Sequence, residues 1–557
     1  MTQLIEIWEE LTGSRPSPST QIAHIADSIT LLRYCDAIFR FCGKRLYLQD
    51  VVEYDTIERH ARLLEVRDGG HRHWGGSSQV STNHPKGGYL PSPPPDYIDS
   101  SALGGPKAPQ STNSSGQEYR SSPRERLIWA EALSEMNKVG LASVTVEDII
   151  PIRESLHRMV IGQRSQSYHV RMVFRVHNAS VHQIRRGLEK ALVSRPMLRT
   201  MLLNSASEGL YHIVLGISHD LFENIVLTRE LELEKEAEEH WQDDSEAKHS
   251  FPLMFQAEII SVRESENSYL SMLFNHSVVD ALSLWPWHKD LDLLIDDINA
   301  KTWTPTPFKM FSDLFSQYQN SVPAQEAVSF HVRRLRGISR LKRALWPLQR
   351  APGWMILSDR GSKYACARDE VRQAVWNGEW KTKASAFRYP RLGRVVTLSQ
   401  LQELKKHGIE PSLFAKSAIV ILNVLQTGAS HAVFSTWESG RSWPFVPRWM
   451  EEMLPPAMSI DGPTVEWILD MIEVAKDENI LDFLARMAAE NEEMRNHEHV
   501  PWQDVVKELR DEGDVAIDAS FRQSFVWDMS LGLNALKGNR SVFKCLEPVA
   551  RLDWADW

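Results

Sequence analysis

A histidine and an aspartate four residues apart form the first pattern in this sequence that suits catalysis. His276 and Asp280 lie in the segment FNHSVVDA (274–281), which follows one apolar run and precedes another. An imidazole titrates near neutral pH, so a positioned histidine can accept a proton from an attacking hydroxyl or amine. The same spacing also arises by chance around ordinary surface or core histidines. His276 is a candidate general base, and Asp280 is better placed to fix the loop than to touch a substrate.

A serine at the start of an amphipathic segment is the second candidate. Ser28 lies in ADSI (26–29), where Ser and Asp are favoured as ordinary helix N-caps. A helix N-terminus also offers free N–H groups and the positive end of the helix dipole, which suit a phosphodiester. Ser28 is therefore either a simple cap or the attachment point of a phosphate-linked group.

Apolar periodicity predicts the elements that hold these residues. Near the N-terminus, apolar residues at helical spacing predict a small all-α bundle: Leu4, Ile7, Trp8, Ile29, Leu32 and Phe39. Farther along we expect strands over 167–176, 255–262, 268–274, 395–397 and 432–436, and helices over 181–193, 283–298, 399–406 and 413–425. Strands alternating with helices over so long a segment indicate α/β layers in two lobes.

Composition separates these two regions. Of the 56 residues from 67 to 122, 27 are Gly, Pro or Ser, so this segment buries too little apolar surface to offset its ordering entropy. We expect a flexible linker over 67–122, a small module over 1–66, and a large module whose lobes span 123–300 and 301–557.

The large module carries several motifs in a fixed order. They are Arg158-Met159, SRPMLRT (194–200), HSVVDA (276–281), Ser439-Gly440-Arg441 and HEHVPWQDVV (497–506). Together they resemble the condensation domain of nonribosomal peptide synthetases, within the chloramphenicol-acetyltransferase-like superfamily. The resemblance implies a two-lobed α/β fold with the active site in a tunnel between the lobes. It also implies that His276 is catalytic and that Asp280 pairs with Arg441 across the lobes as structural support.

The chain departs from that family at three motif positions. Asn275 stands where the family has a first histidine, Ala281 where it has a final glycine, and Leu156 where it has a glutamine. The late DFGWG segment of the related plant acyltransferases, which use soluble coenzyme A thioesters, is absent from the sequence.

The small module resembles the second half of a carrier domain of the same synthetases. Its DSI segment is followed by a helical stretch, a Gly43-Lys44-Arg45-Leu46 turn and a last helical stretch, although Ile25-Ala26 replaces the usual Gly-Gly. The resemblance implies that Ser28 carries 4′-phosphopantetheine, attached by a phosphopantetheinyl transferase.

The domain order, a carrier followed by a linker and a condensation domain, is similar to that of fungal fumonisin-type esterifying proteins. It is also similar to terminal condensation domains. It implies an acyltransferase that moves an acyl group from the carrier to a hydroxyl or amine of a small-molecule acceptor, such as a polyketide, in secondary-metabolite biosynthesis. No adenylation domain fits, so a separate adenylating or acyl-loading enzyme is expected to act in trans. Two other roles stay open, a cyclising or releasing condensation domain and a non-catalytic scaffold for partner enzymes. Whether the product is an ester or an amide also stays open.

Composition also argues against several classes of protein. A net charge of -10 opposes nucleic-acid binding. The four cysteines have no CxxC spacing, so neither a disulfide scaffold nor a zinc site is expected. The N-terminus lacks a signal peptide pattern, and the longest apolar run, 418–425, is far short of a membrane span. We therefore expect a cytoplasmic protein without a membrane partner.

Overall fold

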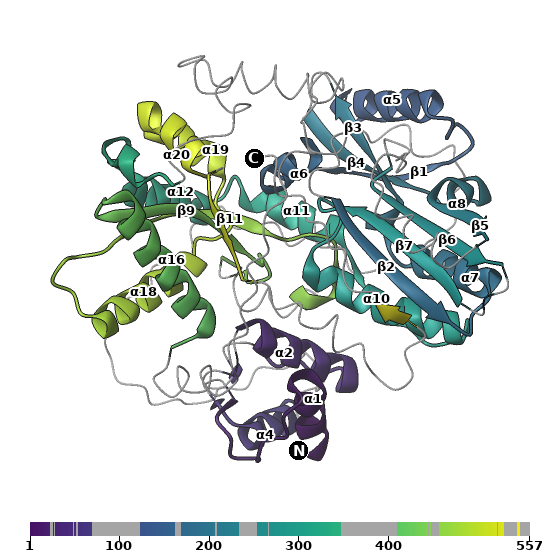
Figure 1. The fold of residues 1–557 in the computed structure, drawn as a ribbon, viewed down its shortest axis with the longest axis horizontal. Coiled ribbons are helices and arrows are strands. Elements are labelled where there is room, and N and C mark those ends of the chain that lie inside the picture. The colour runs from purple at the N-terminus through teal and green to yellow at the C-terminus, as the bar shows by residue number, and fades with distance from the viewer. Residues whose placement is uncertain are drawn as a thin grey trace, which may run out of the picture.

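The computed structural model contains a small helical module and a larger α/β module (Figure 1). It describes residues 1–22, 26, 28–47, 50–51, 54–68, 123–161, 169–205, 209–232, 253–263, 265, 267–346, 409–443, 445–446, 456–520, 522–527 and 543–545. Nearly all of the predicted linker lies outside these residues, as do the elements expected over 395–397 and 399–406.

The small module packs helices around one apolar core. Its helices are α1 (Thr2–Thr12), α2 (Ser28–Cys42) and α4 (Ile57–Asp68). Trp8 of α1 is 2% exposed and meets the ring of Tyr34 edge-on, with the ring centroids 5.4 Å apart. The helical character was predicted, but the buried side of α2 runs through Leu31, Tyr34 and Ile38. Phe39, which we placed on that stripe, instead contacts the large module.

The first lobe of the large module is built on two sheets. A five-stranded sheet has the order β13-β2-β7-β6-β5, and a three-stranded sheet has the order β1-β4-β3. The strands are β1 (Val146–Pro151), β2 (His169–His177), β3 (Thr200–Ser205), β4 (Gly209–Leu215), β5 (Val226–Leu231), β6 (Phe255–Val262), β7 (Asn267–Asn275) and β13 (Phe543–Cys545). Helices α7 (Val181–Val193) and α10 (Ala281–Asp296) pack together against the larger sheet (Figure 1).

The remaining helices of the first-lobe region are α5 (Pro123–Lys138), α6 (His157–Ile161) and α8 (His219–Ile225). Together, these elements enclose the largest apolar core of the described chain, which includes Phe174, Phe255, Phe274 and Trp287. Trp287 meets the rings of Phe255 and Phe274 edge-on, so α10 is anchored directly to β6 and β7. This anchoring fixes the helix that begins just after His276.

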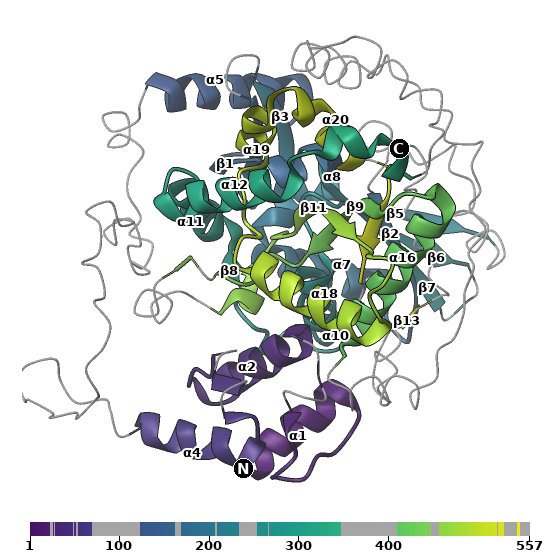
Figure 2. The ribbon, with the colours of Figure 1, turned by 90° about the vertical axis from the view of Figure 1, so that its left-hand side faces the viewer.

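The second lobe has a three-stranded sheet with helices on both faces. Its order is β11-β9-β12, with β9 (His431–Glu438), β11 (Glu466–Glu473) and β12 (Ser524–Val526). The helices are α12 (Val322–Leu335), α16 (Pro411–Thr427), α18 (Ile480–Arg495), α19 (Trp502–Leu509) and α20 (Gly513–Ser520). Val433 and Leu469 pack with α12, α19 and α20, whereas Phe434 and Ile472 pack with α16 and α18. Figure 2 shows these helices around the sheet.

The structure differs from the division we expected at residue 300. β13, near the C-terminal end, pairs with β2 in the first lobe's sheet. β8 (Thr306–Pro307) pairs with β10 (Ile460–Asp461), and α11 (Phe308–Tyr318) contributes Phe308 and Phe311 to the first lobe's core. The two lobes therefore share segments from the second half of the chain.

Candidate active site between the lobes

His276 directly follows the last residue of β7. After it the chain turns and enters α10 at Ala281, so the histidine lies on a short connection between a buried strand and a buried helix. The neighbouring Ser277 is completely buried, and its hydroxyl lies 3.3 Å from Nε2 of the buried His212. The connection therefore has little freedom to move, which suits a residue whose position matters.

Asn275 holds this connection from the strand side. Its Oδ1 accepts a hydrogen bond from the backbone N–H of Ser277 (2.8 Å), and its Nδ2 donates to the carbonyl of Met159 (3.1 Å). Met159 belongs to the early Arg-Met motif, so the asparagine ties two of the sequence motifs together. A carboxamide provides both an acceptor and two donors, which explains how asparagine serves this position.

His276 faces the second lobe. Its ring is 6.1 Å from the ring of Trp437 in β9, with the two planes nearly perpendicular at 71°. Trp437 in turn stacks on Trp467 of β11 with the centroids 4.9 Å apart. The half-buried histidine thus lies where the two lobes meet, as the motif resemblance implied. Neither tryptophan was marked by a pattern in the sequence.

Asp280 and Arg441 form the expected ion pair between the lobes. Nη2 of Arg441 lies 2.9 Å from each carboxylate oxygen of Asp280, and the two residues are 1% and 7% exposed. Asp280 is also the N-cap of α10, accepting from the backbone N–H of Ser283 (2.7 Å). The N–H of Thr464 donates to the same carboxylate (3.1 Å). Asp280 therefore joins the helix behind His276 to the second lobe.

Arg441 has further partners that fix its side chain. It donates to the carbonyls of Ala457 (2.7 Å), Ile460 (3.2 Å) and Gly462 (3.0 Å). Gly440, before it, has a φ of 62°, and a Cβ there would be 1.7 Å from the carbonyl oxygen of Thr464. The Ser-Gly-Arg segment thus needs glycine because a second strand of backbone passes against it.

The charge state of Asp280 follows from these contacts. Burial by itself raises the pKa of the carboxyl, but the charge of Arg441 and the N–H groups of Thr464 and Ser283 outweigh burial and hold the pKa below its usual range. Asp280 is consequently a carboxylate at neutral pH, the charge state in which it pairs with Arg441.

Two more buried arginines cross between the lobes, and sequence reasoning missed their partners. Arg153 pairs with Glu466 of β11 and lies over the rings of Phe311 (4.7 Å) and Phe315 (4.2 Å). Arg195, in the SRPMLRT segment, pairs with Asp461 of β10 at 3.2 Å and with Asp290 of α10 at 2.8 Å. Only the order of the motifs marked the segments that contain these arginines. The neighbouring sequence does not indicate which acidic residue each arginine pairs with.

The HEHVPWQDVV segment lies beside Arg441. His499 is 1% exposed, and its Nε2 is 2.7 Å from the carbonyl of Ser442. Burial, with a contribution from Arg153, lowers the pKa of His499 to about 3, so this histidine is neutral and supports the structure. Arg158 has no described side chain, whereas Met159 is fully buried.

Ser28 is the first residue of α2, as predicted, and no acidic residue lies in the first turn of that helix. The small module lies against the large one with α2 facing it (Figure 2). Phe39 meets the ring of Trp303 edge-on at 6.4 Å, and Arg40 lies 5.1 Å over the same ring. α2 also contacts the 3-10 helix Ala457–Ser459, whose first carbonyl binds Arg441. The structure thus places α2 next to the segment that supports Arg441.

The residues that the structure describes contain neither a group of metal-ligating side chains nor a helix that could span a membrane. Among those residues, no three His, Cys, Asp or Glu side chains are grouped so that they could hold a metal ion. None of the helices in the described part is both long and apolar enough to cross a membrane.

Comparisons with known proteins give structural neighbours only. No protein-family model matches the sequence, and no curated protein matches it either. Similar solved structures include holo T3CT, with 14% identity, 70% of this chain and 77% of that chain covered, and a TM-score of 0.47. The condensation domain of the Monacolin K polyketide synthase MokA has 12% identity, coverage of 66% and 77%, and a TM-score of 0.45. The first condensation domain of the CDA synthetase has 11% identity, coverage of 66% and 78%, and a TM-score of 0.43.

Proposed function

We propose that this protein is a condensation-type acyltransferase, which transfers an acyl group from a thioester on Ser28 to a hydroxyl or amine of a small-molecule acceptor. The observation that carries the proposal is the position of His276. It stands at the meeting of the two lobes, on a connection held by Asn275 on one side and by the Asp280–Arg441 pair on the other.

His276 is the proposed general base. The acceptor's oxygen or nitrogen attacks the thioester carbonyl while His276 accepts the proton that it loses. A new C–O or C–N bond forms, the C–S bond breaks, and the thiol leaves with the proton that His276 returns. A positioned base of this kind contributes roughly 10²–10⁴-fold to the rate. Asp280 and Arg441 are positioning residues, because their contacts are with each other and with backbone rather than with His276's reacting side.

Ser28 is the proposed attachment site of 4′-phosphopantetheine. It begins a 15-residue helix with no carboxylate in its first turn, so the helix terminus offers N–H groups and positive dipole to a phosphodiester. When bound, this group supplies a thiol that carries the acyl chain as a reactive thioester. A phosphopantetheinyl transferase and a separate adenylating or acyl-loading enzyme are the proposed partners. The packing of α2 beside the segment that holds Arg441 supports delivery to the same large module.

The test separates loading from transfer. The full chain is co-expressed with a phosphopantetheinyl transferase, loaded with a labelled acyl group and mixed with polyol and amine acceptors. Ser28→Ala removes loading by intact mass, whereas His276→Ala keeps loading and loses transfer by about 10²-fold or more. His219→Ala is the matched control, because the His219 side chain is 81% exposed on α8.

Each of three outcomes would overturn a part of the proposal. Loading that persists in Ser28→Ala removes the carrier assignment. Undiminished transfer by His276→Ala removes the base, and the absence of transfer by a loaded wild-type chain with every acceptor favours the scaffold instead.

A further inference from the structure

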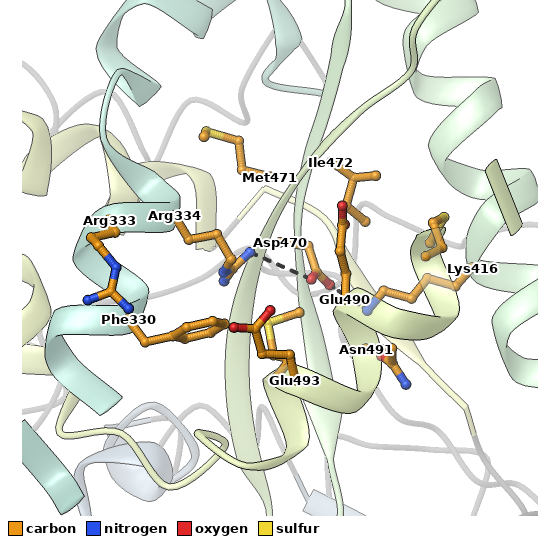
Figure 3. A pocket seen from close by; sticks show the side chains of 12 residues that line it. Phe330, Arg333, Arg334, Lys416, Asp470, Met471, Ile472, Glu490, Asn491 and Glu493 are labelled. Carbon is orange, nitrogen blue, oxygen red and sulfur yellow. Dashed lines mark ion pairs between the residues drawn. The ribbon is translucent and has the colours of Figure 1, made fainter. Parts of the chain in front are cut away.

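The second lobe contains a cavity of about 370 Å³ at the β11 edge of its sheet. It is enclosed by α12, α16, α18 and the edge strand β11 (Figure 3). Its volume is at the lower end of the range for small-molecule sites, roughly 300–1,000 Å³. Nothing in the proposed acyl transfer uses this cavity.

The cavity opens along the free edge of the second lobe's sheet. β11 is the outermost strand, and two of its carbonyls are covered by arginine side chains: Leu469 by Arg334 and Glu473 by Arg486. Successive residues of a strand point their backbone N–H and C=O groups to opposite sides of the strand. Met471 lies midway between Leu469 and Glu473, so its backbone groups face the same edge as theirs. Met471 lines the cavity. The wall therefore includes backbone as well as side chains.

Charged side chains of both signs meet on the cavity wall. Asp470 of β11 is completely buried, and Lys416 of α16 is 4% exposed. Nζ of Lys416 lies 2.9 Å from Oδ2 of Asp470. On the other side, Nη1 of Arg334 is 3.9 Å from Oδ1, which is too long for a hydrogen bond. Figure 3 shows both cations directed at this one carboxylate.

Two polar atoms of this group are left without hydrogen bonds. Within the part of the chain that the structure describes, Nε of Arg334 and Oδ1 of Asp470 are buried and have no hydrogen-bond partner. Buried polar atoms of this kind are rare in native proteins and call for an explanation. One is a donor and the other an acceptor, so a partner that offers both an acceptor and a donor would satisfy the two atoms together.

The rest of the lining is apolar inside and charged outside. Phe330, Ile472, Met487 and Met494 supply the apolar wall, and methionine adapts well to irregular shapes. Arg333 and Glu493 are exposed at the rim, and Glu490 is paired with Arg486 at 3.0 Å. The polar atoms in the interior, rather than the rim, thus select the ligand.

We propose that this cavity binds a free α-amino acid with an apolar side chain. Its carboxylate is the acceptor for Arg334 and Lys416, and its ammonium is the donor for Asp470 Oδ1. Its side chain lies against Phe330, Met487 and Met494. The site is independent of the proposed acyl transfer, so its failure leaves that proposal unchanged.

The test compares three ligands of one shape by isothermal titration calorimetry on the full chain. L-leucine has both groups, 4-methylpentanoate lacks the amine, and L-leucinamide lacks the carboxylate. Leucine should bind at one site per chain, and each analogue should bind at least about tenfold more weakly, as expected for the loss of one charge-assisted contact. Absence of leucine binding overturns the site. Equal binding of 4-methylpentanoate or of leucinamide overturns the amino-acid class.

Variants locate the binding in this cavity. Arg334→Gln should weaken leucine binding by about tenfold or more, whereas Arg336→Gln, at an exposed position at the end of α12 that does not line the cavity, should leave it unchanged. Because Arg334 also covers the carbonyl of Leu469, Met494→Trp provides a second variant that fills the cavity and keeps the charges. Circular dichroism checks that each variant is folded. Wild-type binding by folded Met494→Trp would place the ligand elsewhere and overturn the proposal.

Discussion

Gly440 allows a prediction that separates the effect of backbone strain from the effect of a steric clash. Its φ is 62°, and Gly428, at the end of α16, has a φ of 64°. An added Cβ would be 1.7 Å from the carbonyl oxygen of Thr464 at residue 440 but would meet nothing within 4 Å at residue 428. Alanine at either position therefore has the same backbone strain, and only alanine at 440 has a clash.

The two substitutions should differ severalfold in their effect on stability. The left-handed conformation costs a residue with a Cβ roughly 1–2 kcal/mol, and Gly428→Ala should lose only this amount. Gly440→Ala must also move Thr464, whose N–H binds Asp280 and whose hydroxyl binds the Ser439 carbonyl. Disrupting the buried Asp280–Arg441 pair adds about 3–5 kcal/mol, which gives about 4–7 kcal/mol in all.

Urea unfolding, followed by tryptophan fluorescence and circular dichroism, measures this difference. The midpoints are compared for variants whose unfolding free energy depends on urea with the same slope. Gly440→Ala should also lose acyl transfer, whereas Gly428→Ala should keep it. Equal midpoints for the two variants would refute the reasoning, because they would mean that Thr464 moves aside without disturbing the pair.

Further predictions concern the same network and the buried His212. Asp280→Asn and Arg441→Met should each lose about 3–5 kcal/mol of unfolding free energy, and the double variant should lose at least about 1 kcal/mol less than their sum; additive losses in urea unfolding would separate the two residues. Because the pKa of Asp280 is lowered in the folded state, its stabilising contribution is complete above the unfolded value of about 3.9 and is lost as the pH falls through the folded pKa. Asp280→Asn should therefore remove part of the acid sensitivity of the midpoint below pH about 4, and an unchanged acid profile would contradict this. Burial lowers the pKa of His212 to about 3, so the protein should lose stability as the pH falls from about 6.5 toward that value, and His212→Gln should reduce this loss in the midpoint measured against pH. Asn275→Ala should lose about 1–3 kcal/mol and lower the rate of transfer without affecting loading of Ser28, and undiminished transfer would show that the loop is held without it.

The elements nearest the site were predictable because their patterns are local. The expected bounds of the helix over 181–193 and the strand over 255–262 match α7 and β6, and those of β7, β9, α10 and α16 differ by one or two residues at each end. β13 was missed because three residues give no periodicity, and its place beside β2 depends on a contact with a strand far away in sequence. The same reason explains why the lobe division at residue 300 differs from the structure.

The candidate site shows a similar limit. The spacing of His276 and Asp280 is visible within one segment, but Arg441 is 161 residues from Asp280, and only the resemblance to a known family linked them. Trp437, Glu466 and Asp461 carried no signal, because a residue that meets another lobe has no local pattern to mark it. On α2, Phe39 departed from the predicted core stripe because it packs against Trp303 of the large module. Predictions failed where a residue's partner lies on a distant element.

The three buried pairs between the lobes suggest what the molecule gains from them. Arg153–Glu466, Arg195–Asp461 and Asp280–Arg441 each bury charge, and buried ion pairs are often no more stabilising than apolar residues of the same size. Their geometry is far more restrictive, however, because each arginine fits its carboxylate in few orientations.

Together the three pairs fix how one lobe meets the other. His276 belongs to the first lobe, and the Trp437 ring that it faces belongs to the second. Their relative position therefore depends on how the two lobes are aligned. An apolar replacement would preserve stability while allowing the lobes to slide. We infer that the ion pairs set the shape of the site around His276, which is why weakening any one of them should affect transfer more than loading of Ser28.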